Sequence, residues 1–165
     1  MIALVTGASS GIGRDIAREL AKRKYDIIAV ARGREALENL KAELEKDYQV
    51  KVDVREQDLT DREGCKKLHQ DIKGKYGTID VLVNDAGFGT CGKFTETDLE
   101  KEIKMIDTNV VALHILTKLF LQDMVKEDKG HILNVASIAG FMPGPLMATY
   151  YSTKSYVVRL TQSIR

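Results

Sequence analysis

The chain has 165 residues, a formal net charge of +1 and a hydrophobic fraction of 44%. These values are typical of one globular domain, and the near-zero charge argues against nucleic acid or a membrane surface as the main partner. The two cysteines have no metal-site spacing, and neither a signal peptide nor a run of roughly 18 apolar residues is present, so we expect a reduced, cytoplasmic protein.

Short apolar segments alternate with amphipathic segments along the whole chain. The apolar segments predict five strands, at residues 2–5, 27–30, 50–54, 79–83 and 132–135. Helical spacing of apolar residues predicts helices over about 12–21, 36–44, 65–72 and 97–126, and a last helix that begins near Ala148 and is still running at Arg165. Thr97 and Glu100 form a capping-box signature at the start of the fourth helix. The alternation predicts an α/β fold, a Rossmann-like doubly wound parallel sheet in a three-layer α/β/α arrangement.

A glycine-rich turn, Thr6-Gly7-Ala8-Ser9-Ser10-Gly11-Ile12-Gly13, separates the first strand from the first helix. Glycines allow a sharp turn and a close approach of backbone N–H groups to a pyrophosphate, and the N-terminus of a helix favours anions. A glycine pattern alone is weak, because many turns contain glycine. Its position between a strand and a helix at the start of a βαβ unit predicts a nucleotide site.

The spacing T-G-x-x-x-G-x-G resembles that of the short-chain dehydrogenase/reductase family. Other segments resemble the same family in the correct order, and the match spans residues 1–165 without a gap: Asp58-Leu59-Thr60-Asp61, Asn84-Asp85-Ala86-Gly87, Asn109, Ser137 and Tyr150-x-x-x-Lys154. Asp85 departs from the family motif, which has asparagine there.

The resemblance implies both a cofactor site and a catalytic set. The implied catalytic residues are Asn109, Ser137, Tyr150 and Lys154. The implied cofactor-binding residues are Gly7, Ser9, Ser10, Gly11, Ile12, Gly13, Arg32, Asp58, Leu59, Asn84, Ala86 and Gly87, together with Tyr150 and Lys154. By resemblance, Lys154 also binds the nicotinamide ribose, and Asn109 distorts its helix and holds a water in a proton relay to Lys154.

The chemistry of the proposed catalytic residues supports these roles. Tyr150 and Lys154 are four residues apart and share one face of a helix. A free tyrosine titrates near 10, and a nearby ammonium lowers the pKa of a phenol, so Lys154 would make Tyr150 a better general acid and base. Ser137 follows the fifth strand, where its hydroxyl can polarise a carbonyl. Tyr151, three residues before Lys154, is a poorer alternative to Tyr150.

The end of the second strand indicates which dinucleotide is bound. An NAD site usually has an acidic residue there, which bonds the ribose 2′-hydroxyl. This strand is followed instead by Arg32-Gly33-Arg34. Guanidinium groups suit a 2′-phosphate, so NADP(H) is predicted in preference to NAD(H), with Arg32 the better candidate and Arg34 the alternative.

The predicted function is hydride transfer between NADP(H) and a carbonyl or secondary alcohol. Members of the family continue beyond the position of Arg165 through two strands, a Pro-Gly loop and a substrate-binding segment. We therefore expect one dinucleotide-binding domain, residues 1–165, incomplete at its C-terminus. The alternative is a nucleotide-binding module without turnover. An epimerase or dehydratase of nucleotide sugars ranks third, because its phosphate turn has a different spacing.

The remaining predictions concern partners and metals. By resemblance, the fourth and last helices form a homodimer or homotetramer interface, and the substrate is a small molecule. Nucleic acid and membrane partners are not expected. No two histidines have metal-ligand spacing, so no metal site is predicted. His69 falls in a polar helix and is predicted to be solvated.

Overall fold

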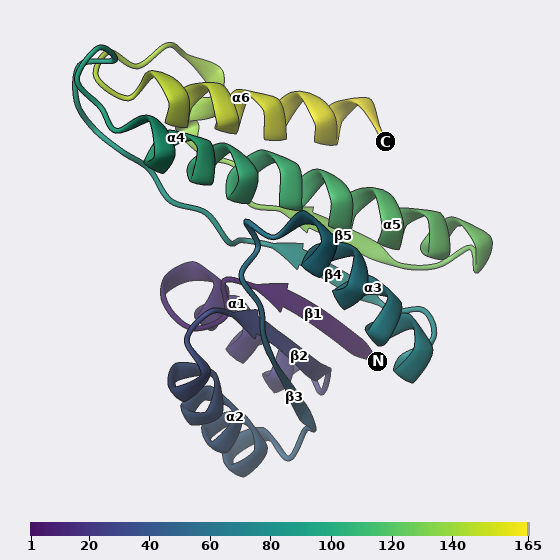
Figure 1. Ribbon diagram of the computed structural model, residues 1–165. Coiled ribbons are helices and arrows are strands. Elements are labelled where there is room, and N and C mark those ends of the chain that lie inside the picture. Colours follow the sequence, from purple (N-terminus) through teal and green to yellow (C-terminus); the bar gives the residue numbers. More distant parts are fainter. Residues whose placement is uncertain (165) are drawn as a thin grey trace.

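A single parallel sheet organises the molecule, which is described by a computed structural model over residues 1–164. Its strands are β1 (Ile2–Thr6), β2 (Asp26–Ala31), β3 (Val52–Glu56), β4 (Val81–Asn84) and β5 (His131–Asn134), in the spatial order β3-β2-β1-β4-β5 (Figure 1). The chain adds β2 and β3 on one side of β1, and β4 and β5 on the other. This reversal creates a crevice at the carboxyl ends of β1 and β4, where open α/β sheets bind ligands. The predicted fold class is confirmed.

Helices cover both faces of the sheet. The first face carries α1 (Gly11–Lys22) and α2 (Arg34–Tyr48), and the second carries α3 (Arg62–Tyr76) and α5 (Leu113–Lys126). In Figure 1, α6 (Ala148–Ser163) runs beside α4 (Leu99–Ile106), beyond the layer that contains α5. Among residues 1–164, no helix has the length and apolar character that crossing a membrane requires.

The alternation of side chains along the strands explains the two cores. In β1, Ala3 and Val5 pack on the side of α1 and α2, whereas Leu4 packs on the side of α3 and α5. Both sets are fully buried. Because successive residues of a strand point to opposite faces, a strand covered on both sides reads as a continuous apolar run, as this one does.

The long fourth helix is interrupted in its middle. It consists of α4, a π-helical segment η1 (Asp107–Ala112) and α5, rather than one regular helix. The capping prediction was wrong by one residue, because the side chain of Asp98, not Thr97, accepts a hydrogen bond from the N–H of Lys101. The Thr97 hydroxyl instead donates to the carboxylate of Glu102, at 2.7 Å.

The prediction that His69 is solvated was wrong. Its ring is 7% exposed, lies 2.7 Å from a carboxylate oxygen of Asp123 on α5 and meets the ring of Phe120 edge-on. Lys73 pairs with the other carboxylate oxygen of Asp123. A polar residue of α3 therefore joins α3 to α5, because Asp123 provides the partner that a buried imidazole requires.

Candidate active site

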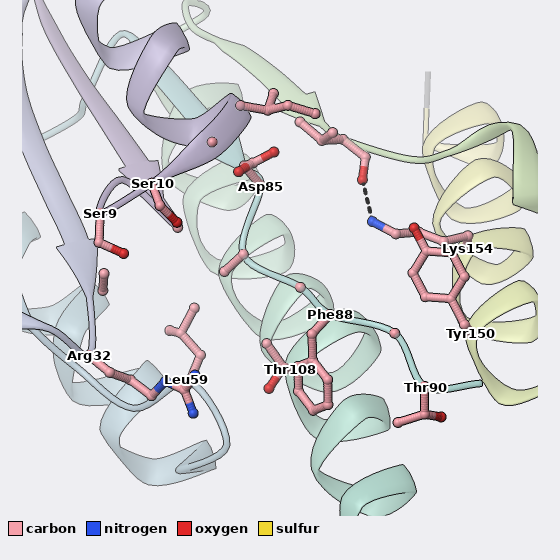
Figure 2. Close-up of a pocket in the computed structure, with 18 of the residues that line it drawn as sticks. Ser9, Ser10, Arg32, Leu59, Asp85, Phe88, Thr90, Thr108, Tyr150 and Lys154 are labelled. Carbon is pink, nitrogen blue, oxygen red and sulfur yellow. Dashed lines mark hydrogen bonds between the residues drawn. The ribbon is translucent and has the colours of Figure 1, made fainter. Parts of the chain in front are cut away.

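A cavity of about 810 Å³ lies at the carboxyl ends of the strands. Figure 2 shows Arg32 and Leu59 at one end, Tyr150 and Lys154 at the other, and Ser9, Ser10 and Asp85 along the side between them. The lining therefore includes most of the residues predicted from the nucleotide motif, namely Gly7, Ser9, Ser10, Gly11, Ile12, Arg32, Asp58, Leu59, Ala86, Gly87, Tyr150 and Lys154.

The turn after β1 leaves hydrogen-bond donors available at the start of α1. Ser10 is the N-cap residue, but its side chain makes no capping hydrogen bond, and no acidic residue lies in the first turn of the helix. Gly11 has φ +55°, a left-handed conformation that favours glycine, and a Cβ there would meet nothing within 4 Å. Open space beside helix N–H groups that Ser10 does not cap is the arrangement that a phosphate group needs.

The glycine at position 7 is required by close packing against the loop that follows β4. Gly7 has φ +71°, and a Cβ there would lie 2.9 Å from the backbone nitrogen of Ala86. The hydroxyl oxygen of Thr6 accepts hydrogen bonds from the N–H groups of Asp85 (3.1 Å) and Ala86 (3.2 Å). The turn after β1 and the loop after β4 are thereby held together as one side of the cavity.

The end of the cavity near β2 and β3 combines positive and negative groups. Arg32 is exposed, lines the cavity and makes no ion pair with any of residues 1–164. Arg34 lies outside the lining and pairs with Glu38 at 3.7 Å. Hydrogen bonds from the backbone and then the hydroxyl of Thr60 lower the pKa of the Asp58 carboxyl. The charge of Arg32 also lowers this pKa, so this end holds a carboxylate and a nearby guanidinium that form no direct ion pair.

Tyr150 and Lys154 enter the opposite end from α6. The Lys154 ammonium donates a hydrogen bond to the backbone oxygen of Val135 at 2.9 Å and lies 6.0 Å from the centre of the Tyr150 ring (Figure 2). Lys154 is only 7% exposed. Burial lowers the pKa of its ammonium, and the charge of Asp85 opposes this shift. A buried cation beside a phenol is suited to proton transfer.

Asn109 lies in η1, outside the cavity lining, and holds the loop that forms the cavity floor. Its side-chain oxygen accepts from the N–H of Phe88 (3.1 Å), and its amide donates to the backbone oxygen of Phe88 (2.9 Å) and to the hydroxyl of Thr153 (3.1 Å). A Cβ at Gly87 would lie 2.9 Å from Asn109 Oδ1 and 3.8 Å from Lys154 Nζ. Asn109 and Lys154 therefore converge on Gly87.

Three other predicted site residues also lie outside the lining. Gly13 is buried, and a Cβ there would lie 2.6 Å from the carbonyl oxygen of Gly7. Asn84 is 3% exposed and donates to Thr117 and Asn134 below the cavity. Ser137 caps a short 3-10 helix, η2 (Ile138–Phe141): its hydroxyl oxygen accepts from the N–H of Ala139 at 3.2 Å. Its neighbour Ala136 does line the cavity.

Several lining residues were not predicted from the sequence. Thr108 faces the cavity from η1, next to Asn109, and Val135 contributes a backbone oxygen, which no motif can reveal. Gln57 precedes Asp58 and lines the same end, so its position beside a predicted residue was the available signal. Within residues 1–164, no group of three or more His, Cys, Asp or Glu side chains is placed to hold a metal ion.

Comparisons with known proteins agree on one family. A family model described as short chain dehydrogenase matches residues 1–165. An NADP-dependent 3-hydroxy acid dehydrogenase of Schizosaccharomyces pombe is 36% identical over 98% of this chain. A short-chain dehydrogenase from Sphingobium yanoikuyae in complex with NADPH has a TM-score of 0.93 at 32% identity, and an NAD+-bound xylitol dehydrogenase has 0.91 at 29% identity, each over 99% of this chain. The chain spans 63% of the length of each of these three proteins.

Proposed function

Because the chain belongs to the short-chain dehydrogenase family, we propose that it transfers a hydride between NADP(H) and a carbonyl or secondary alcohol. The observation that carries this proposal is one cavity that is lined along its side by the start of α1 and at one end by Tyr150 and Lys154. A dinucleotide lying along the cavity would bring its reactive ring to the phenol. When bound, the nicotinamide supplies or accepts the hydride.

The preference for NADP(H) rests on Arg32. A guanidinium that lines the cavity and has no carboxylate partner is suited to a phosphate group, whereas Arg34 is already engaged by Glu38. The Sphingobium yanoikuyae structure contains NADPH, and the Schizosaccharomyces pombe relative is NADP-dependent. The xylitol dehydrogenase binds NAD+, so relatives of similar fold differ in this choice.

The positions of Tyr150 and Lys154 in the cavity lining support the proposed catalytic roles. The Tyr150 hydroxyl would give its proton to the substrate oxygen during reduction and take it back during oxidation. The buried Lys154 ammonium would favour the phenolate, and its bond to Val135 fixes its position. The Ser137 oxygen already accepts from Ala139, so its own O–H proton is available to donate to the substrate oxygen.

The proposed role of Asn109 is indirect, because its side chain lies outside the cavity lining. Its side chain is engaged by Phe88 and Thr153, and it approaches Gly87 together with Lys154. This proximity supports membership of the proposed proton relay that leads to Lys154. The interruption of the helix at η1 supports it as well, because π-helical turns are frequent at functional sites.

The decisive experiment compares Tyr150→Phe with Tyr151→Phe. NADPH consumption is followed with a panel of ketones, and NADPH binding is measured separately by fluorescence. Removal of the proton donor at Tyr150 is expected to lower kcat by about 10²–10⁴-fold and to affect NADPH binding far less, whereas Tyr151→Phe keeps activity. Full activity in Tyr150→Phe would refute the mechanism. Binding of NADPH without turnover of any ketone would favour a nucleotide-binding module.

We also propose that two copies of the chain associate through the fourth and last helices. Leu113, Leu116 and Phe120 of α5 are buried against the sheet, so the surface left for a partner lies between α4, η1 and α6. A groove there is lined mainly by apolar groups of Phe94, Ile106, Val110 and Tyr156. Analytical ultracentrifugation at micromolar concentration is expected to show a dimer or tetramer, and a strictly monomeric protein would contradict this proposal.

A further inference from the structure

The residue that departs from the family motif, Asp85, places a carboxyl group against the glycine-rich turn. Its Oδ2 atom lies 2.6 Å from the position of a Cβ at Gly13 and 3.1 Å from that of a Cβ at Gly7. Asp85 also lines the cavity, together with Ser9 and Ser10 of the turn (Figure 2). A carboxyl group therefore lies beside the start of α1, where the proposed function would bring the phosphates of the dinucleotide.

Few groups face this carboxyl. The backbone amide of Gly13 lies beside it, and Lys154 is the charged group that approaches it from α6. The Tyr150 side chain shares the end of the cavity that holds Lys154, and the other charged lining residues, Arg32 and Asp58, lie at the far end. Burial raises the pKa of Asp85, and the Gly13 amide and Lys154 oppose this shift. Burial therefore destabilises the charged form of Asp85 by more than Gly13 and Lys154 stabilise it.

A pyrophosphate bound at the start of α1 would add negative charges beside a carboxylate that is already poorly solvated. Like charges that share a site cannot all remain ionised without a large electrostatic cost. The N–H groups of α1 can stabilise the pyrophosphate, but they do not remove the repulsion between it and Asp85. The least costly solution is the neutralisation of the weaker acid, which is the carboxyl group.

We propose that Asp85 takes up one proton from solvent when the dinucleotide binds, so that binding is coupled to pH through this residue. The carboxylate becomes a carboxylic acid, and its new O–H bond supplies the donor that the family's asparagine amide would provide. This inference rests on the proposed binding of a dinucleotide. It makes Asp85 a positioning residue for the cofactor, not a group that reacts.

The direction of the pH effect follows from linkage. If binding favours the protonated form, affinity is highest below the pKa of Asp85 in the free protein. It then falls by up to about tenfold per pH unit until the pKa of the bound form is passed, and is constant above it. In Asp85→Asn this dependence disappears, and near neutral pH the variant binds the dinucleotide more tightly than the original chain.

The experiment measures the affinities for NADH and NADPH by fluorescence between about pH 5 and 9, and proton uptake by calorimetry in buffers of different ionisation enthalpy. NADH is included because the 2′-phosphate of NADPH titrates near 6. Asp85→Asn is compared with Asp47→Asn, whose side chain is exposed outside the cavity. The expected result is uptake of up to one proton by the original chain and by Asp47→Asn, in the pH range where the affinity falls, and none by Asp85→Asn.

The outcomes separate this inference from the function on which it rests. Dinucleotide binding with the same pH profile and proton uptake in Asp85→Asn as in the original chain overturns the role of Asp85 and leaves the proposed function intact. A change of affinity that is equal at every pH assigns Asp85 a purely structural role and overturns the inference as well. Failure of the original chain and both variants to bind either dinucleotide overturns the proposed function.

Discussion

Replacement of Arg32 by alanine tests the proposed choice of cofactor. The guanidinium lines the cavity and has no ion pair within residues 1–164, so its removal should leave the fold unchanged. A hydrogen bond to a charged group contributes about 1.5–3 kcal/mol. Because Arg32 is exposed, water screens its interaction with a phosphate, and we expect the lower end of this range. The affinity for NADPH should therefore fall about tenfold.

The assay compares the dissociation constants of NADPH and NADH for Arg32→Ala and for a control, Arg34→Ala. NADH has no 2′-phosphate, so its affinity should be the same in Arg32→Ala as in the original chain. The control should bind both dinucleotides normally, because Arg34 pairs with Glu38 outside the cavity. Equal weakening of NADPH and NADH in Arg32→Ala, or a larger loss in Arg34→Ala, would refute the assignment of Arg32 to the 2′-phosphate.

Three further substitutions should change stability, which is measured by denaturant unfolding. Gly74→Ala should stabilise α3 by about 0.5–1 kcal/mol, because a Cβ at this position meets nothing within 4 Å. Gly13→Ala should cost about 1–3 kcal/mol of stability and disturb dinucleotide binding, because its Cβ would lie 2.6 Å from the carbonyl oxygen of Gly7. Asp123→Asn should cost about 1–2 kcal/mol at neutral pH. Burial raises the pKa of Asp123, but Lys73 and His69 outweigh it and the net shift is downward, so this stabilisation is present above about pH 4 and is lost as the pH falls through the folded pKa. A difference between Asp123→Asn and the original chain that persists well below that pH would contradict the ion-pair explanation.

The fold was predictable because apolar runs and amphipathic segments alternate along most of the chain. Apolar runs such as β1 are buried on both faces, and the amphipathic segments between them each bury one face, so periodicity alone identifies strands and helices. Boundaries were less accurate. Ile79 is fully buried, like a strand residue, yet β4 begins at Val81. Burial determines the apolar pattern, whereas hydrogen bonding between strands determines where a strand begins.

Features that depend on contacts between distant segments could not be predicted from the sequence. The polar pattern around His69 suggested solvent, because the partner that makes its burial tolerable, Asp123, lies 54 residues away. Asn109 lies in the π-helical segment, and the backbone of Phe88 engages both ends of its side chain. No periodicity within the helix encodes such a contact, and only the family resemblance suggested a distortion there.

The motif residues also divide into two physical classes that the sequence treats alike. Ser9, Ser10 and Arg32 present polar groups to the cavity, whereas Asn84 and Asn109 use theirs to fix the loop and strands around it. A cavity lined by loops keeps its shape only if buried side chains satisfy the loop backbones, since an unpaired buried polar group is costly. Substitution in the first class should therefore change the affinity for the dinucleotide at constant stability. Substitution in the second class should lower stability and affinity together.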